Sequence, residues 1–163
     1  MILRIKPSGM IKYKDCYVVF EEIPDMLSLA INLTNCQNNC IGCHSPELRC
    51  NIGNVLTEDV LDKLINDNFG INCVLFMGEG NDKETLIALA KYIKTKYNLK
   101  TAIYSGRNKV EDEFYGVFDY IKIGPYIEKY GPLNSETTNQ KLYFIGNDGI
   151  EDITYKFWRK GGH

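Results

Sequence analysis

Three cysteines lie close together in one polar stretch of the chain, at Cys36, Cys40 and Cys43, with the spacing Cys-x3-Cys-x2-Cys. Three thiolates leave a tetrahedral metal ion one protein ligand short, and they leave one iron of a four-iron cluster without a protein ligand. In either case one coordination position stays open to a substrate, as in catalytic metal sites. The spacing therefore predicts that these three cysteines bind the catalytic centre of the protein.

A structural zinc site is the alternative for the same loop, with His44 or Cys50 as the fourth ligand. Zinc-binding cysteines usually come as paired Cys-x2-Cys units, however, and this loop contains a single such unit. The alternative would make the protein a non-catalytic, zinc-stabilised interaction module. A colourless protein that holds one zinc ion would support it.

Composition limits the class of protein further. The chain has 163 residues, of which 44% are hydrophobic and 25% charged, and its formal net charge is −2. These values predict one soluble globular domain and no nucleic-acid partner. No apolar run reaches the ~20 residues that cross a bilayer, and the first residues lack a signal-peptide pattern. We therefore expect a cytoplasmic protein without membrane association, in which Cys16 and Cys73 are buried thiols rather than disulfides.

The elements that must position the cysteine loop can be read from periodicity. Residues 27–33 alternate between apolar and polar side chains, which predicts a strand that ends at the loop. We expect further strands at 17–23, 74–77, 101–104, 120–123 and 142–145, and helices at 57–68, 82–97 and 109–115. A capping box of Asn81 and Glu84 is expected to begin the second helix.

This alternation of strands and helices predicts an α/β fold with a mostly parallel sheet. The units are too few for a closed eight-stranded barrel, which needs about 200–250 residues. We therefore expect an incomplete β/α barrel, or an open sheet, with an open lateral side. One domain is expected to span 1–163, with a β-rich lead-in at 1–26, the strand and cluster loop at 27–50, and a C-terminal loop, strand and tail at 124–163.

Polar residues and glycines follow several of the predicted strands and are expected to meet at one edge of the sheet, because parallel strands share a carboxyl-end edge. Glu79 would accept a hydrogen bond from a ligand amine, and the exposed backbone of Gly78 and Gly80 would allow close approach. Ser105 and Lys122 would contact a carboxylate or a ribose. The plainer alternatives are a helix cap for Glu79, an ordinary turn at Ser105 and a solvated lysine at Lys122.

The spacing of Cys36, Cys40 and Cys43 resembles the signature of radical S-adenosylmethionine (SAM) enzymes, and the segment 77–80, Met-Gly-Glu-Gly, resembles their Gly-Gly-Glu-Pro segment. Residues 43–47, Cys-His-Ser-Pro-Glu, resemble the Cys-His-Asn-Pro-Glu of glycyl-radical-enzyme activases. Segments at 124–127, 131–135 and 138–143 resemble the activating proteins of anaerobic ribonucleoside-triphosphate reductases. The resemblance spans roughly residues 15–158.

The resemblance implies a radical SAM fold in which the three cysteines bind a [4Fe–4S] cluster. It implies SAM as the second cofactor, bound by Gly78, Glu79, Gly80, Ser105, Lys122 and Asn139. An electron donor such as flavodoxin would reduce the cluster. The 5′-deoxyadenosyl radical from SAM would then take a hydrogen atom from a glycine of the reductase large subunit.

Two departures from the family pattern stand out. Gly42 occupies a position where many radical SAM enzymes carry an aromatic residue near the adenine, and the first and last residues of the 77–80 segment differ from Gly-Gly-Glu-Pro. A radical SAM enzyme that acts on another protein, a peptide or a small molecule is therefore kept as an alternative.

Overall fold

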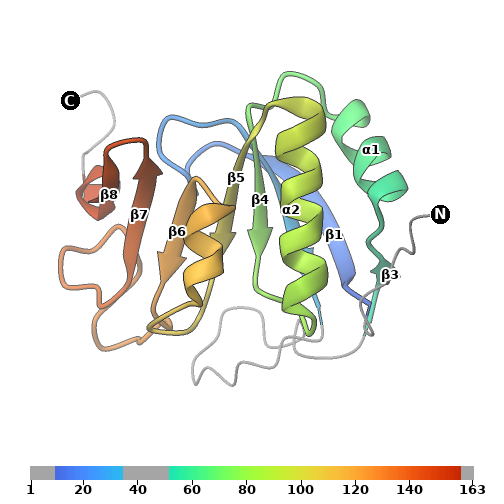
Figure 1. Cartoon of the computed structure of the whole chain (residues 1–163). Coiled ribbons are helices and arrows are strands. Elements are labelled where there is room, and N and C mark those ends of the chain that lie inside the picture. The colour runs from blue at the N-terminus through green and yellow to red at the C-terminus, as the bar shows by residue number, and fades with distance from the viewer. Residues whose placement is uncertain (1–9, 35–51, 159–163) are drawn as a thin grey trace.

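A computed structural model describes residues 10–34 and 52–158, which form one eight-stranded sheet with helices beside it (Figure 1). The strand order is β3-β1-β2-β4-β5-β6-β7-β8. The strands are β1 (Lys12–Val19), β2 (Ser28–Leu33), β3 (Asn54–Val55), β4 (Cys73–Met77), β5 (Lys100–Tyr104), β6 (Tyr120–Ile123), β7 (Lys141–Gly146) and β8 (Gly149–Asp152). The helices are α1 (Glu58–Asp67) and α2 (Lys83–Tyr97), with short 3₁₀ turns η2 (Asp112–Gly116) and η3 (Thr154–Trp158).

The sheet is mixed. Its centre, β2-β4-β5-β6, is parallel, as expected, but β3, β1, β7 and β8 all pair antiparallel with their neighbours. The prediction of a mostly parallel sheet is therefore wrong at both flanks. The reason at β1–β2 and β7–β8 is connection length, because a parallel neighbour needs a crossover of a dozen or more residues and these connections are shorter. Within the described residues the sheet does not close, since β3 and β8 stand at its two ends.

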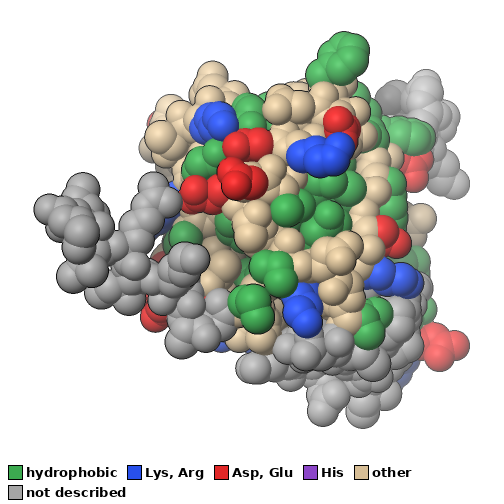
Figure 2. Space-filling view, turned by 90° about the vertical axis from the view of Figure 1, so that its right-hand side faces the viewer, with side chains coloured by type: hydrophobic (Ala, Val, Ile, Leu, Met, Phe, Trp, Pro, Cys, Tyr) green, Lys and Arg blue, Asp and Glu red, His purple; other side chains and the backbone are tan. Residues whose placement is uncertain are grey.

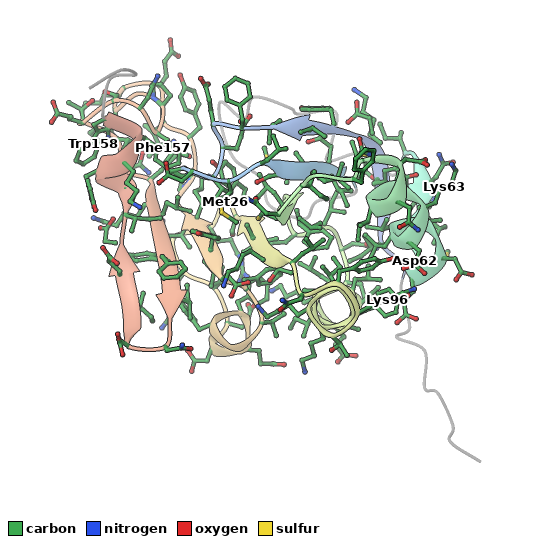
Figure 3. All side chains as sticks on the ribbon, turned by 90° about the horizontal axis from the view of Figure 1, so that it is seen from above. Met26, Asp62, Lys63, Lys96, Phe157 and Trp158 are labelled. Carbon is green, nitrogen blue, oxygen red and sulfur yellow. The ribbon has the colours of Figure 1, made fainter. Side chains whose placement is uncertain are left out.

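The helices cover one face of the sheet, and Figure 3 shows this arrangement from above. Apolar residues of α1, α2 and η2 pack there against the strands, among them Leu61, Leu86, Ile93 and Phe114. The opposite face is covered by the segment between β1 and β2 and by η3. Ile23, Met26, Ile153 and Phe157 pack there against Ala30, Leu75 and Ala102.

A polar cluster joins the two helices on their outer side. Asp62 of α1 accepts hydrogen bonds from the hydroxyls of Tyr92 and Tyr97 and from Lys96 of α2, whose Nζ lies 3.0 Å from Oδ2 (Figure 3). Hydrogen bonds from these three side chains to Asp62, led by that of Tyr97, lower the pKa of its carboxyl. The cluster fixes α1 against α2 and lies away from the polar residues described below.

Helix starts follow local side-chain chemistry. Thr57 caps α1, since its hydroxyl accepts from the backbone N–H of Val60 at 3.2 Å. The capping box of Asn81 and Glu84 is wrong, because Asp82 caps α2 and accepts from the N–H of Thr85 at 3.2 Å.

The first strand begins earlier than the predicted 17–23 and ends at Val19. Lys12 and Tyr13 of β1 pair with β3, and within residues 10–34 and 52–158 no other strand pairs with that edge of β1. Tyr17 and Val18 are exposed there. Figure 2 views the side with α1, β1 and β3, where hydrophobic side chains reach the surface among charged ones. No helix in the described part of the chain is long and apolar enough to cross a membrane.

Candidate functional site

The four parallel strands end together at one edge of the sheet. Met77 is in register with Asn32 and Tyr104, and Tyr104 is in register with Lys122. The segments that follow β2, β4, β5 and β6 therefore start at the same edge. This confirms the expectation that these strand ends meet.

The three cysteines Cys36, Cys40 and Cys43, together with His44 and Cys50, lie outside the described residues. The two ends of the segment 35–51 are described, however. The buried hydroxyl of Thr34, directly after β2, donates to the carbonyl oxygen of Ile52 at 2.6 Å. The chain thus leaves and re-enters the described fold at one point, which lies at the carboxyl-end edge of β2.

Glu79 follows β4 at this edge and is buried. Its carboxylate accepts a hydrogen bond from the Ser105 hydroxyl and a bidentate pair from Arg107, with Nε–Oε2 at 2.8 Å and Nη2–Oε1 at 2.6 Å. The side chain of Glu79 is 3% exposed and that of Arg107 is 27% exposed. Since Asp82 caps α2, the helix-cap alternative for Glu79 is wrong.

A second carboxylate holds the same guanidinium. Glu111 accepts from Nη1 of Arg107 at 2.7 Å and from Nη2 at 2.9 Å, and also from Lys83 at 3.0 Å. The hydrogen bonds from Arg107, helped by Lys83, lower the pKa of the Glu111 carboxyl to about 2. The hydrogen bonds to Glu111 and Glu79 raise the pKa of Arg107. The Glu111 carboxylate is therefore ionised at neutral pH, and Arg107 is a cation that lies between Glu111 and Glu79.

Lys122 is buried, not the solvated lysine of the plainer alternative. It is 7% exposed, and its Nζ donates to the carbonyl oxygens of Ser105 at 3.2 Å and Gly124 at 3.0 Å. The Nζ also lies 5.3 Å from the centre of the Tyr104 ring. These bonds tie the end of β6 to the end of β5. Ser105 is fully buried and its hydroxyl donates a hydrogen bond to Glu79, so it is more than an ordinary turn residue.

The two glycines beside Glu79 differ in surroundings. Gly78 has a φ of +96°, a conformation that favours glycine. Gly80 is buried, and a Cβ there would lie 3.5 Å from the Ile11 side chain. The expectation of an exposed backbone at Gly80 is therefore wrong, because the turn after β4 packs back onto the residue that precedes β1.

Asn139 lies near the same edge. Its Nδ2 donates to the carbonyl oxygen of Pro125 at 3.1 Å, while its Oδ1 is buried and has no hydrogen-bond partner among the described residues. An unpaired buried oxygen of this kind is costly unless it meets a donor. The side chain is thus suited to accept a hydrogen bond from an N–H of a bound ligand.

Two residues at the site were not predicted as functional, Arg107 and Glu111. The signal available in the sequence was weak: an arginine two residues beyond Ser105 and a glutamate four residues further on. The pairing of Arg107 with Glu79 depends on β4 and β5 being neighbours in the sheet, and the spacing of apolar residues does not reveal which strands are neighbours.

Comparisons of the chain with protein-family models, with curated proteins and with solved structures gave no match. Within residues 10–34 and 52–158, no group of three or more His, Cys, Asp or Glu side chains is placed to hold a metal ion.

Proposed function

We propose that this protein is a radical SAM enzyme of the glycyl-radical-enzyme activase type. It would bind a [4Fe–4S] cluster through Cys36, Cys40 and Cys43 and use SAM to install a glycyl radical on the large subunit of an anaerobic ribonucleoside-triphosphate reductase. The observation that supports this most is spatial. The segment with the three cysteines begins and ends at the sheet edge where Glu79, Ser105 and Lys122 gather.

The residues at the edge suit the polar groups of SAM. Glu79 offers a buried carboxylate as acceptor for the ammonium group, and Ser105 holds that carboxylate in place. Asn139 offers a buried acceptor oxygen. Lys122 adds positive charge beneath the edge and keeps β5 and β6 aligned. When bound, the cluster supplies the electron that cleaves SAM, a chemistry that belongs to the cofactor.

The open sheet suits a protein substrate. Because the described sheet ends at β3 and β8 without closing, the site would be reachable from the side by a loop of another protein. On this proposal the fold is an incomplete barrel of the radical SAM type, and a donor such as flavodoxin supplies the electron in the cytoplasm.

The test is anaerobic reconstitution with iron and sulfide, followed by addition of SAM and a reductant. We expect about four irons per chain, release of 5′-deoxyadenosine, and a glycyl radical in the EPR spectrum of the added reductase. Cys40→Ala should abolish SAM cleavage, whereas Cys73→Ala, a matched change of a buried thiol in β4, should leave it intact.

Each alternative gives a different result. Formation of 5′-deoxyadenosine without a radical on the reductase would point to a radical SAM enzyme with another substrate. A colourless protein with one zinc ion and no SAM cleavage would identify the zinc-stabilised module. Full SAM cleavage by Cys40→Ala would refute the cluster assignment.

A further inference from the structure

Glu79 and Arg107 form a bidentate ion pair at the proposed site, and this pair limits how a ligand can reach Glu79. Arg107 bonds to both carboxylate oxygens of Glu79, with N–O distances of 2.8 and 2.6 Å, and Ser105 bonds to one of them. A ligand ammonium that needs Glu79 must therefore compete with the guanidinium. An arginine displaced into a buried site without a new anion would be costly.

Glu111 removes part of that cost. The guanidinium of Arg107 is bonded to Glu111 through Nη1 and Nη2, and Glu111 is bonded to Lys83. Arg107 can therefore release Glu79 and still be held by a carboxylate. Release frees the Nε–H and one Nη2–H, which together form the planar fork that suits a carboxylate.

An α-amino acid is the complement of such a pair. Its ammonium and carboxylate are attached to the same carbon, so a zwitterion that enters between Glu79 and Arg107 gives each charged side chain a new partner. The ammonium takes the place of the guanidinium on Glu79, and the carboxylate takes the place of Glu79 on Arg107. Every charge is then paired before and after binding, which is the condition for a low cost in a buried site.

The other cations at this edge are less suited to the carboxylate. Lys122 is 7% exposed and donates to two backbone carbonyls that join β5 to β6, so moving it would break that connection. Lys83 is bonded to Glu111, with its Nζ 3.0 Å from Oε1. Arg107 bonds directly to the proposed ammonium acceptor, with Nη2 2.6 Å from Oε1 of Glu79.

We propose that Arg107 recognises the α-carboxylate of the ligand's amino-acid end. To do so, Arg107 releases Glu79 and bonds to the ligand carboxylate, while Glu111 keeps its hydrogen bonds to the guanidinium. This inference rests on the proposed function, in which that ligand is SAM. Arg107 thereby determines specificity for a zwitterion and rejects an amine that lacks the carboxylate.

The test compares equilibrium binding of SAM and of decarboxylated SAM to the anaerobically reconstituted protein and its Arg107→Gln variant. In each protein the preference is the ratio of the dissociation constants for decarboxylated SAM and SAM. The change in this ratio between wild type and variant is the result that counts, because loss of the carboxylate removes any bond that it makes to iron in both proteins. We expect Arg107→Gln to lose about tenfold of the preference for SAM, the size of one charge-assisted contact. Lys63→Met, which removes an exposed cation on α1, should keep the preference.

The outcomes separate the two proposals. If the wild-type protein binds neither compound, the proposed function fails. If it prefers SAM and Arg107→Gln keeps the same preference, the role of Arg107 is overturned. Should Arg107→Gln not fold, Arg107→Lys carries the test, since it keeps the charge and loses the fork; we expect at least a threefold loss, and an unchanged preference overturns the proposal.

Discussion

Replacing Arg107 by methionine tests how much its ion pair with Glu79 contributes to the stability of the unliganded protein. The change removes the cation from Glu79, whose carboxylate stays buried with the Ser105 hydroxyl still bonded to it. Removing one partner of a fully buried ion pair costs about 3–5 kcal/mol. Since Arg107 is 27% exposed, we expect a lower value, about 2–3 kcal/mol at pH 7.

The assay is urea denaturation with linear extrapolation to zero denaturant. Lys63→Met is the control, because Lys63 forms an exposed ion pair with Asp67 one helical turn away in α1, and such pairs contribute little. We expect its midpoint to match that of the wild-type protein. If the urea midpoint of Arg107→Met also matches that of the wild-type protein, the ion pair between Arg107 and Glu79 is contradicted.

A double variant sharpens the test. Glu79→Gln removes the buried negative charge, so adding it to Arg107→Met should cost less than the sum of the two single changes. We expect a coupling of about 1–2 kcal/mol, as for residues in direct contact. Strictly additive effects would refute the direct pairing of Glu79 with Arg107.

Three further outcomes are expected. Because its partners lower the pKa of Glu111 to about 2, its ionised form contributes stability above its ordinary pKa, and this is lost as pH falls towards 2; acid unfolding of Glu111→Gln should lack that part of the pH dependence. Burial raises the pKa of the Cys73 thiol to about 12, so iodoacetamide at pH 8 should label it only after unfolding, as mass spectrometry would show; rapid labelling of native protein would contradict its burial. Gly124→Ala should cost about 1–2 kcal/mol in urea denaturation, because Gly124 has a φ of +99° and a Cβ there would lie 3.1 Å from Cα of Gln140. The control, Gly116→Ala, meets no atom within 4 Å and should cost less than Gly124→Ala.

Much of the fold could be predicted from the sequence where apolar pattern and burial coincide. The strands that became β2, β4, β5 and β6 are short apolar runs, and the structure has them within a residue or two of the expected bounds. Leu86, Ala90 and Ile93 recur at helical spacing in the predicted helix 82–97, and all three are buried in α2. These strands lie in the centre of the sheet and are buried on both faces, and α2 is buried on one side. Burial therefore leaves a clear apolar pattern in their sequences.

The edges of the sheet were harder to predict for the same reason. Lys12 to Asp15 are mostly polar and belong to β1 only because they pair with β2 and β3. Phe20 and Ile23 are apolar and were expected in the strand, yet the chain leaves the sheet after Val19 and buries Ile23 on the face opposite the helices. Pairing and turn geometry decide such positions, and neither is a property of a local pattern.

The candidate site shows the same division. Glu79, Ser105 and Lys122 were predicted from their places at strand ends, and the structure connects Glu79 to Ser105 and Ser105 to Lys122. The placement of Arg107 on both Glu79 and Glu111 could not be predicted, because it depends on side-chain geometry across neighbouring strands. Whether the cysteines bind a cluster stays a prediction.

The hydrogen bond between Thr34 and Ile52 has a consequence for how a metal centre would assemble. For an unfolded chain, bringing together the ends of a 17-residue segment costs about 2.5 kcal/mol of chain entropy, plus a constant. The pairing of β1 with β2 and β3 already meets that cost when the protein folds, because the two anchor residues are set by the sheet. If side chains of residues 35–51 bind a metal centre, the two ends of that segment are already held together by the fold. The free energy of metal binding would then not be reduced by the cost of loop closure.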